Sequence, residues 1–288
     1  MICASFTRGF KPGGSNLTYG YTEAEDAAMG NAIAPPLVLP TFDSESIAAY
    51  EAGLKTDLID GRLRANVAAF FYEYEDLQFQ ATDPDVFRGG VANIPEAEMK
   101  GVELELIGII SDSFTFDLKM AHLDSEVTKN FDTLDNVKAN STIPAPPWCS
   151  PVGYLGFCYE DLRYQNRENI KGNELAKSPD LTASASLRYQ TNLSSGNSVF
   201  GSIDYVHRGE FQQRVINHPL IDTVKDYNVL NLTAGIDLDG AWGFDLMIFN
   251  ATNEDGINSA MTDVFGVNAT GIEFIPPRQV MARISYTF

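Results

Sequence analysis

The chain has 288 residues, of which 39 are Asp or Glu and 20 are Lys or Arg, so its formal net charge is −19. This charge argues against a nucleic-acid partner, because phosphate binding requires clustered Lys and Arg. Hydrophobic residues make up 44% of the chain, too many for a disordered protein. No stretch approaches the ~18 consecutive apolar residues of a transmembrane helix, but the composition is compatible with a membrane β-barrel, whose strands are apolar on one face only.

About ten segments alternate apolar and polar residues with a period of two, which indicates strands with one apolar and one polar face. In the clearest segment, Leu230 and Leu232 alternate with Asn231 and Thr233. In chain order, the segments cover approximately residues 2–10, 50–58, 63–71, 102–106, 114–120, 181–190, 199–205, 228–239, 242–248 and 280–288. The sequence therefore predicts an all-β fold.

The connections between these segments alternate between short and long. The short ones contain the Asp, Asn, Gly and Ser of tight hairpin turns, and they cover residues 59–62, 111–113, 191–197 and 238–241. The long ones cover approximately residues 11–43, 81–95, 129–178, 214–224 and 254–276. Short periplasmic turns and long extracellular loops are typical of outer-membrane barrels, so we predict an antiparallel transmembrane β-barrel portion.

Charged residues of both signs lie on the predicted polar faces, which suits a water-filled or plugged lumen. They are Glu51, Lys55, Asp57, Arg64, Glu103, Glu105, Asp117, Lys119, Arg188, Asp204, Asp237 and Arg283. In a soluble β-sandwich the same residues would form the solvated outer face. A soluble β-sandwich binding module therefore stays open as an alternative.

Several motifs, in order from end to end of the chain, resemble those of TonB-dependent outer-membrane receptors. They are SFTRGFKPGG at residues 5–14, YEAGLKT at 50–56, DGRLR at 60–64, FFYEYEDLQ at 70–78, KGVELEL at 100–106, FNATNE at 249–254, and Pro277-Arg278 leading to the terminal Phe288. The resemblance implies that residues 1–288 form the C-terminal part of one receptor β-barrel domain. The TonB box and the plug of the family have no counterpart here, so we expect a fragment or a truncated gene product.

What the resemblance implies about function is uptake rather than catalysis. The expected cargo is a scarce nutrient, most often an iron-siderophore complex, carried across the outer membrane of a Gram-negative bacterium. The implied partners are outer-membrane lipid, the barrel-assembly machinery, the TonB complex acting through the missing plug, and a small-molecule ligand such as a ferric siderophore.

Aromatic residues of the long loops are the candidate ligand contacts: Tyr19, Tyr21, Trp148, Tyr154, Phe157 and Tyr159. Cys149 and Cys158 bracket a short segment of the longest loop and are predicted to form a disulfide, with two free thiols as the alternative. The resemblance implies that Tyr286 and Phe288 belong to the C-terminal signal for barrel assembly.

A ten-stranded outer-membrane enzyme, such as an omptin-like protease, is a second alternative. It would need Asp and His pairs at the extracellular rim, where His207 and His218 are the candidates, and no segment resembles the omptins. The three Cys and three His show no metal-ligand spacing, so neither a metal nor a cofactor is expected.

Overall fold

The computed structural model describes residues 1–16, 38–83, 88–135, 167–238, 241–262 and 270–288. Every regular element in this described part is a β-strand. Within it, no helix is long and apolar enough to cross a membrane.

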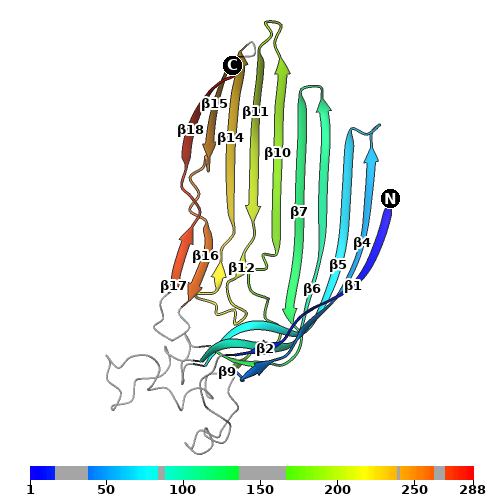
Figure 1. Ribbon diagram of the computed structural model, residues 1–288, viewed down its shortest axis with the longest axis vertical. Coiled ribbons are helices and arrows are strands. Elements are labelled where there is room, and N and C mark those ends of the chain that lie inside the picture. Colours follow the sequence, from blue (N-terminus) through cyan, green and yellow to red (C-terminus); the bar gives the residue numbers. More distant parts are fainter. Residues whose placement is uncertain (17–37, 84–87, 136–166, 239–240, 263–269) are drawn as a thin grey trace, which may run out of the picture.

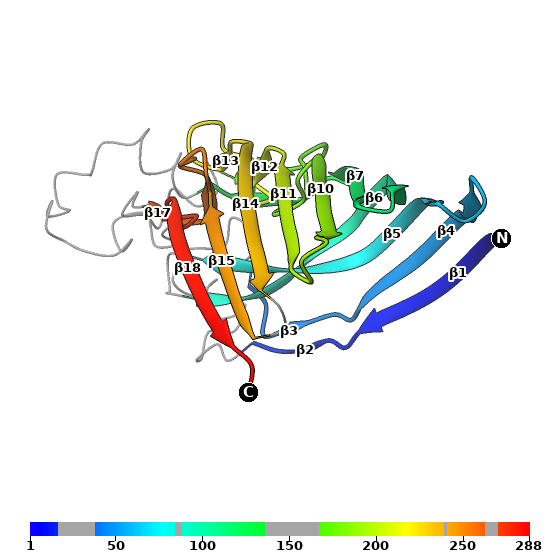
Figure 2. The same cartoon turned by 90° about the horizontal axis from the view of Figure 1, so that it is seen from above.

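Ten of the strands form one antiparallel sheet. Across the sheet they are β1 (Ile2–Lys11), β4 (Glu45–Leu58), β5 (Leu63–Asp83), β6 (Arg88–Ser111), β7 (Phe114–Val127), β10 (Leu181–Asn192), β11 (Ser198–Arg208), β14 (Tyr227–Leu238), β15 (Trp242–Phe249) and β18 (Gln279–Tyr286). Each strand pairs with the next one in this order, and the sheet curves into an arc with β1 and β18 at its two ends (Figures 1 and 2). The ten segments predicted from alternation are these strands.

The pairing register separates two faces, because residues opposite one another on adjacent strands point to the same side of a sheet. One row is entirely apolar and comprises Phe116, Leu187, Ile203, Leu232, Ile248 and Val280. The neighbouring row comprises Asp117, Ser186, Asp204 and Asn231. The charged residues predicted for the polar face all lie on the side of this second row, so the predicted facing is confirmed.

The short turns and the C-terminus lie at one end of the sheet, and the long connections lie at the other, here called the loop end (Figure 1). The turn between β4 and β5 has a left-handed backbone at Ile59, Asp60 and Gly61, with φ of 52°, 53° and 81°. This conformation favours Gly and Asp and suits a tight hairpin. The distribution of short and long connections agrees with the sequence prediction.

Short strand pairs, not predicted from the sequence, lie within the long connections. They are β2 (Gly14–Ser15) with β3 (Thr41–Phe42), β8 (Asp132–Leu134) with β9 (Arg167–Asn169), β12 (Phe211–Gln212) with β13 (Thr223–Val224), and β16 (Ile257–Thr262) with β17 (Thr270–Phe274). They narrow the base of each connection and so hold its two ends close together.

The long loop predicted at residues 81–95 is wrong. β5 and β6 remain paired as far as Asp83 and Arg88, so most of this stretch is a hairpin extension. Pro95 suggested a loop because it cannot donate a ladder hydrogen bond. The strand accommodates it because Asp76, opposite Pro95, has a φ of 54° and its carbonyl accepts a hydrogen bond of 2.7 Å from Asn93 Nδ2 instead.

A hydrophobic core lies at the loop end. Its buried members are Ile94, Ala97, Val127, Ile170, Leu175 and Val215. The extended part of β5 and β6 curves across the concave side of the sheet to reach it (Figures 1 and 2). The hairpin extension is therefore held by burial against other loops, not by the main sheet alone.

Candidate functional site

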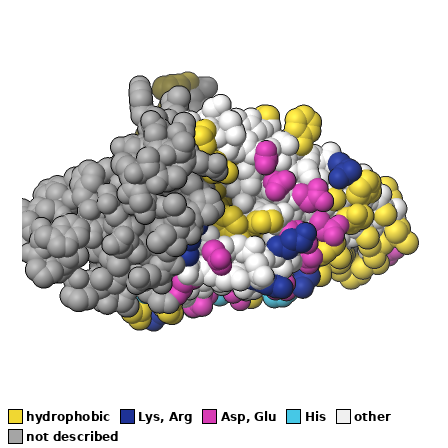
Figure 3. Space-filling model, turned by 90° about the horizontal axis from the view of Figure 1, so that it is seen from below, with side chains coloured by type: hydrophobic (Ala, Val, Ile, Leu, Met, Phe, Trp, Pro, Cys, Tyr) yellow, Lys and Arg dark blue, Asp and Glu magenta, His cyan; other side chains and the backbone are white. Residues whose placement is uncertain are grey.

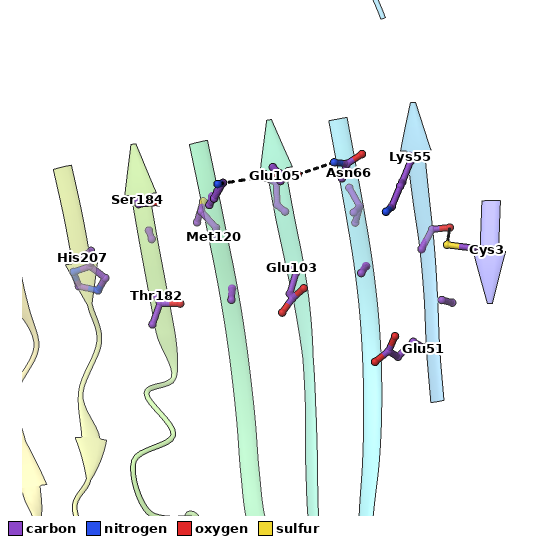
Figure 4. A pocket seen from close by; sticks show the side chains of 18 of the residues that line it. Cys3, Glu51, Lys55, Asn66, Glu103, Glu105, Met120, Thr182, Ser184 and His207 are labelled. Carbon is purple, nitrogen blue, oxygen red and sulfur yellow. Dashed lines mark hydrogen bonds and ion pairs between the residues drawn. The ribbon is translucent and has the colours of Figure 1, made fainter. Parts of the chain in front are cut away.

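A hollow of about 820 Å³ lies on the polar, concave face of the sheet and reaches from β1 to β14. Glu51 and Lys55 from β4, Asn66 from β5, and Glu103 and Glu105 from β6 line it (Figure 4). The alternation of the strands places these side chains on one face, and the curvature of the sheet brings them towards one another.

Hydrogen bonds and ion pairs connect the polar side chains of this concave face. Asn66 Nδ2 donates to Glu105 Oε2 at 2.7 Å, and Lys119 Nζ lies 3.5 Å from the other Glu105 oxygen. The Tyr72 hydroxyl donates to Glu51 at 2.7 Å. Seen from the loop end, acidic and basic side chains gather in the middle of the molecule, with hydrophobic side chains beside them (Figure 3). Such a surface suits water or a polar body and not lipid.

The opposite, convex face exposes large apolar side chains. Examples with exposed fractions of 40–65% are Phe6, Tyr50, Leu54, Val67, Val102, Ile203, Leu246 and Ile284. A continuous apolar surface of this extent is unfavourable in water and matches the lipid-facing band of a transmembrane barrel.

Aromatic rings cluster at the short-turn end of the sheet. Tyr286 lies 4.7 Å from Trp242 and 5.2 Å from Phe288, measured between ring centroids. A second pair, Phe114 and Tyr189, is separated by 4.7 Å. This arrangement resembles the aromatic girdle of membrane barrels, where rings lie at the boundary between lipid and water.

The FNATNE motif closes the base of the last long connection. Asn250 is buried, and its side chain donates to the carbonyls of Glu254 and Pro276 at 2.9 and 3.0 Å. Its Oδ1 accepts from the Glu254 amide at 2.8 Å. One side chain thus holds together both ends of the connection between β15 and β18, which gives the motif a structural role.

The six aromatic residues predicted to contact ligand, and the cysteine pair predicted to form a disulfide, lie outside the described residues. Within the described part, the free cysteine is Cys3, which is exposed. No group of three or more His, Cys, Asp or Glu side chains there could hold a metal ion.

A buried polar cluster at the loop end was missed by the sequence analysis. Arg214 Nε lies 2.6 Å from Asp222 Oδ1, and the Asp222 side chain is fully buried. His218 and Arg214 also lie within 4 Å of Asp135, at 3.8 and 3.9 Å. No sequence pattern links Asp135 to the other three residues, because the long loop that follows it separates them along the chain.

The geometry gives no support to the protease alternative. The side chains of Asp135 and His218 are 1% and 13% exposed, so this pair is not open to a peptide at the surface. His207 Nδ1 lies 2.9 Å from the Asn228 side-chain oxygen, a neutral group that cannot act as its carboxylate partner.

The model of the family "TonB dependent receptor-like, beta-barrel" matches residues 1–253. The chain is also similar to the probable TonB-dependent siderophore receptor PiuA of Acinetobacter baumannii, with 35% identity over 89 residues, which are 31% of this chain and 11% of that protein.

Two solved structures have the same fold over the whole chain. The ferric yersiniabactin uptake receptor FyuA from Yersinia pestis superposes with a TM-score of 0.67 at 16% identity, covering 100% of this chain and 35% of that one. The siderophore receptor PiuA from Acinetobacter baumannii superposes with a TM-score of 0.63 at 19% identity, covering 99% and 34%. The chain thus spans about a third of the length of these receptors. The two-faced antiparallel sheet, its loop end and the family match lead to one conclusion: the chain belongs to the TonB-dependent receptor family, as a portion of its β-barrel.

Proposed function

We propose that residues 1–288 are part of the barrel domain of an outer-membrane receptor that takes up a ferric siderophore in a Gram-negative bacterium. The observation that carries this proposal is the two-faced sheet with all its long connections at one end. Its apolar convex face suits lipid, and its charged concave face suits a polar body in the lumen. The names of its relatives, a siderophore receptor and a ferric yersiniabactin receptor, support a siderophore as cargo.

The concave face would bind the plug of the complete receptor. Glu51 from β4 and Glu103 from β6, with β5 between these strands, point into the hollow, where carboxylates pair well with Lys or Arg (Figure 4). The loops would capture ligand outside the cell, and the TonB complex would act on the plug to open a path. In this mechanism the plug would move along the charged concave face of the sheet.

The loop aromatics Tyr19, Tyr21, Trp148, Tyr154, Phe157 and Tyr159 would supply flat apolar contacts to the ligand. A disulfide between Cys149 and Cys158 would restrict the segment that carries Tyr154 and Phe157 and that Trp148 and Tyr159 flank. Mass spectrometry of unreduced peptides from the complete receptor tests the disulfide, and two alkylatable thiols would refute it. Unchanged ligand affinity in Trp148→Ala would argue against the binding role.

Insertion into the outer membrane would use the barrel-assembly machinery, with Tyr286 and Phe288 as its C-terminal signal. Both side chains are exposed on the edge strand or just beyond it, where a partner strand can approach. Deleting Phe288 from the complete receptor should reduce the amount of heat-modifiable barrel in outer-membrane fractions. Undiminished assembly would contradict this part of the proposal.

Uptake of iron by the complete receptor tests the main proposal. Cells that lack other siderophore receptors would express it and receive radioactive iron as ferric yersiniabactin, ferric preacinetobactin or ferric pyoverdine, the ligands named for structural neighbours. We expect accumulation of at least one complex, and loss of that accumulation in a strain without TonB. Accumulation of none, or equal accumulation without TonB, would overturn the proposal.

A further inference from the structure

Three of the long connections converge on one buried polar cluster at the loop end. The connection from β7 to β10 contributes Asp135, the connection from β11 to β14 contributes Gln213, Arg214, His218 and Asp222, and the connection from β15 to β18 contributes Thr262. These six residues are called the loop hub below. The side chains of Asp135 and Asp222 are 1% and 0% exposed, so the two carboxylates of the hub are withdrawn from water.

Asp222 is the centre of the hub. Its Oδ1 accepts from Arg214 Nε at 2.6 Å and from Gln213 Nε2 at 3.3 Å, and its Oδ2 accepts from the His218 backbone amide at 2.7 Å. The backbone N–H of Gln213 also donates to the backbone carbonyl of Asp222 at 2.7 Å. The Asp222 carboxylate thus joins both ends of the segment 213–222 and its middle by hydrogen bonds.

Two sets of contacts extend from this unit to the other connections. Arg214 and His218 face Asp135 at 3.9 and 3.8 Å. Gln213 Nε2 donates to Thr262 Oγ1 at 2.9 Å, and Thr262 in turn lies 3.1 Å from Thr270 of the paired strand. The Asn217 side chain also accepts from the Glu174 amide at 2.7 Å, a second link to the connection from β7 to β10.

Burial makes these contacts interdependent. A buried charge that loses its partner is strongly unfavourable, because neither water nor another group replaces the lost interaction. Asp222→Asn would replace the carboxylate that Arg214 Nε contacts at 2.6 Å with a neutral amide. It would also turn one of the two acceptor oxygens shared by Arg214, Gln213 and the His218 backbone amide into an NH2 donor. The whole unit should then loosen, together with both connections bound to it.

We propose that the loop hub couples three of the long connections into one cooperative unit. The hub residues are positioning residues: they act through the connections whose bases they hold.

Hydrogen exchange followed by mass spectrometry tests the coupling in the complete receptor in detergent. Asp222→Asn keeps the shape of the side chain and removes its charge. We expect amide exchange to accelerate at least about tenfold in peptides from all three connections, with no change in the strands of the sheet. Asp226→Asn is the matched control, because Asp226 is an exposed carboxylate in the same connection, and it should change nothing.

Acceleration confined to residues 209–226, or none at all, would overturn the hub. If Asp222→Asn fails to assemble, Thr262→Val decides, because it removes the Gln213 contact without unpairing a charge. It should accelerate exchange in residues 209–226 and 257–274 together, and acceleration in only one of them would also overturn the hub.

Discussion

The part of the sheet near the short turns and the loop end both carry large apolar side chains, but these side chains are exposed in the first region and buried in the second. Near the short turns, large apolar side chains such as Ile284 and Trp242 are 65% and 49% exposed. At the loop end, Ile94 and Val127 are 1% and 0% exposed. In the proposed receptor, lipid would cover the apolar face of the first region, whereas in the second region the protein covers its own apolar side chains. An alternating strand alone therefore does not reveal which environment it faces.

Strands β5 and β6 pass through both regions and change face between them. Between the short turn and Asp76, the β5 residues Val67 and Phe71 belong to the convex apolar side. Beyond Asp76, Leu77 and Ile94 pack with the concave-side residues Ala97, Val127 and Tyr74. Asp76, with its left-handed backbone, lies opposite Pro95 at the point where this change occurs, while the pairing register stays the same on both sides. We expect this local conformation to turn the apolar side chains towards the loop-end core.

The largest expected effect comes from a substitution that disrupts the loop-end core. Ile94→Ala removes a fully buried side chain and should lower the free energy of opening of the hairpin extension by ~2–5 kcal/mol. Hydrogen exchange of amides within residues 77–94 measures this. Leu220→Ala, at a side chain that is 86% exposed, should stay within about 0.5 kcal/mol. Equal effects would mean that the extension is not held by this core.

The next effect tests whether the apolar convex face of the sheet faces lipid, as the proposed function requires. Leu232 lies between Ile203 and Ile248 in the apolar row, whereas Thr233 lies opposite Ser202 on the polar face. Leu232→Arg should lower the free energy of unfolding by ~2–4 kcal/mol if that row lies near the bilayer midplane. Thr233→Arg should lower the free energy of unfolding much less. Reversible unfolding of the complete receptor in lipid vesicles compares them. Equal costs would contradict the assignment of the two faces.

The sequence predicted the sheet well because a sheet with one apolar and one polar face requires alternation along its strands. It failed at Pro95, which is typical of a loop, because the compensating backbone conformation of Asp76 leaves no sequence pattern. It also failed at the loop hub, since Asp135, Asp222 and Thr262 meet only after three connections have folded. The loop aromatics stay predictions, because they lie outside the described residues.

A smaller effect tests the change of face at Asp76. Its φ of 54° is costly for a β-branched residue and free for glycine. Asp76→Val should lower the free energy of opening of the hairpin extension by ~1–2 kcal/mol, and Asp76→Gly should leave it nearly unchanged. Hydrogen exchange of residues 77–94 again gives the comparison. If valine and glycine behave alike, the left-handed residue does not control the change of face.

The smallest effect concerns an ion pair at the solvent-exposed edge of the loop end. Lys129 pairs with Glu96, and this hydrogen bond holds the pKa of the Glu96 carboxyl below its ordinary value of 4.5. A carboxyl whose pKa is lower in the folded state adds stability above its unfolded pKa and loses it as the pH falls through the folded value. Lys129→Ala should therefore lower the thermal midpoint slightly at pH 7 and have no effect at a pH below the folded pKa of Glu96. Lys171→Ala, at an exposed lysine outside this pair, should have no effect at either pH. A decrease for Lys129→Ala that is equal at both pH values would show that the lysine stabilises the loop end by packing rather than by charge.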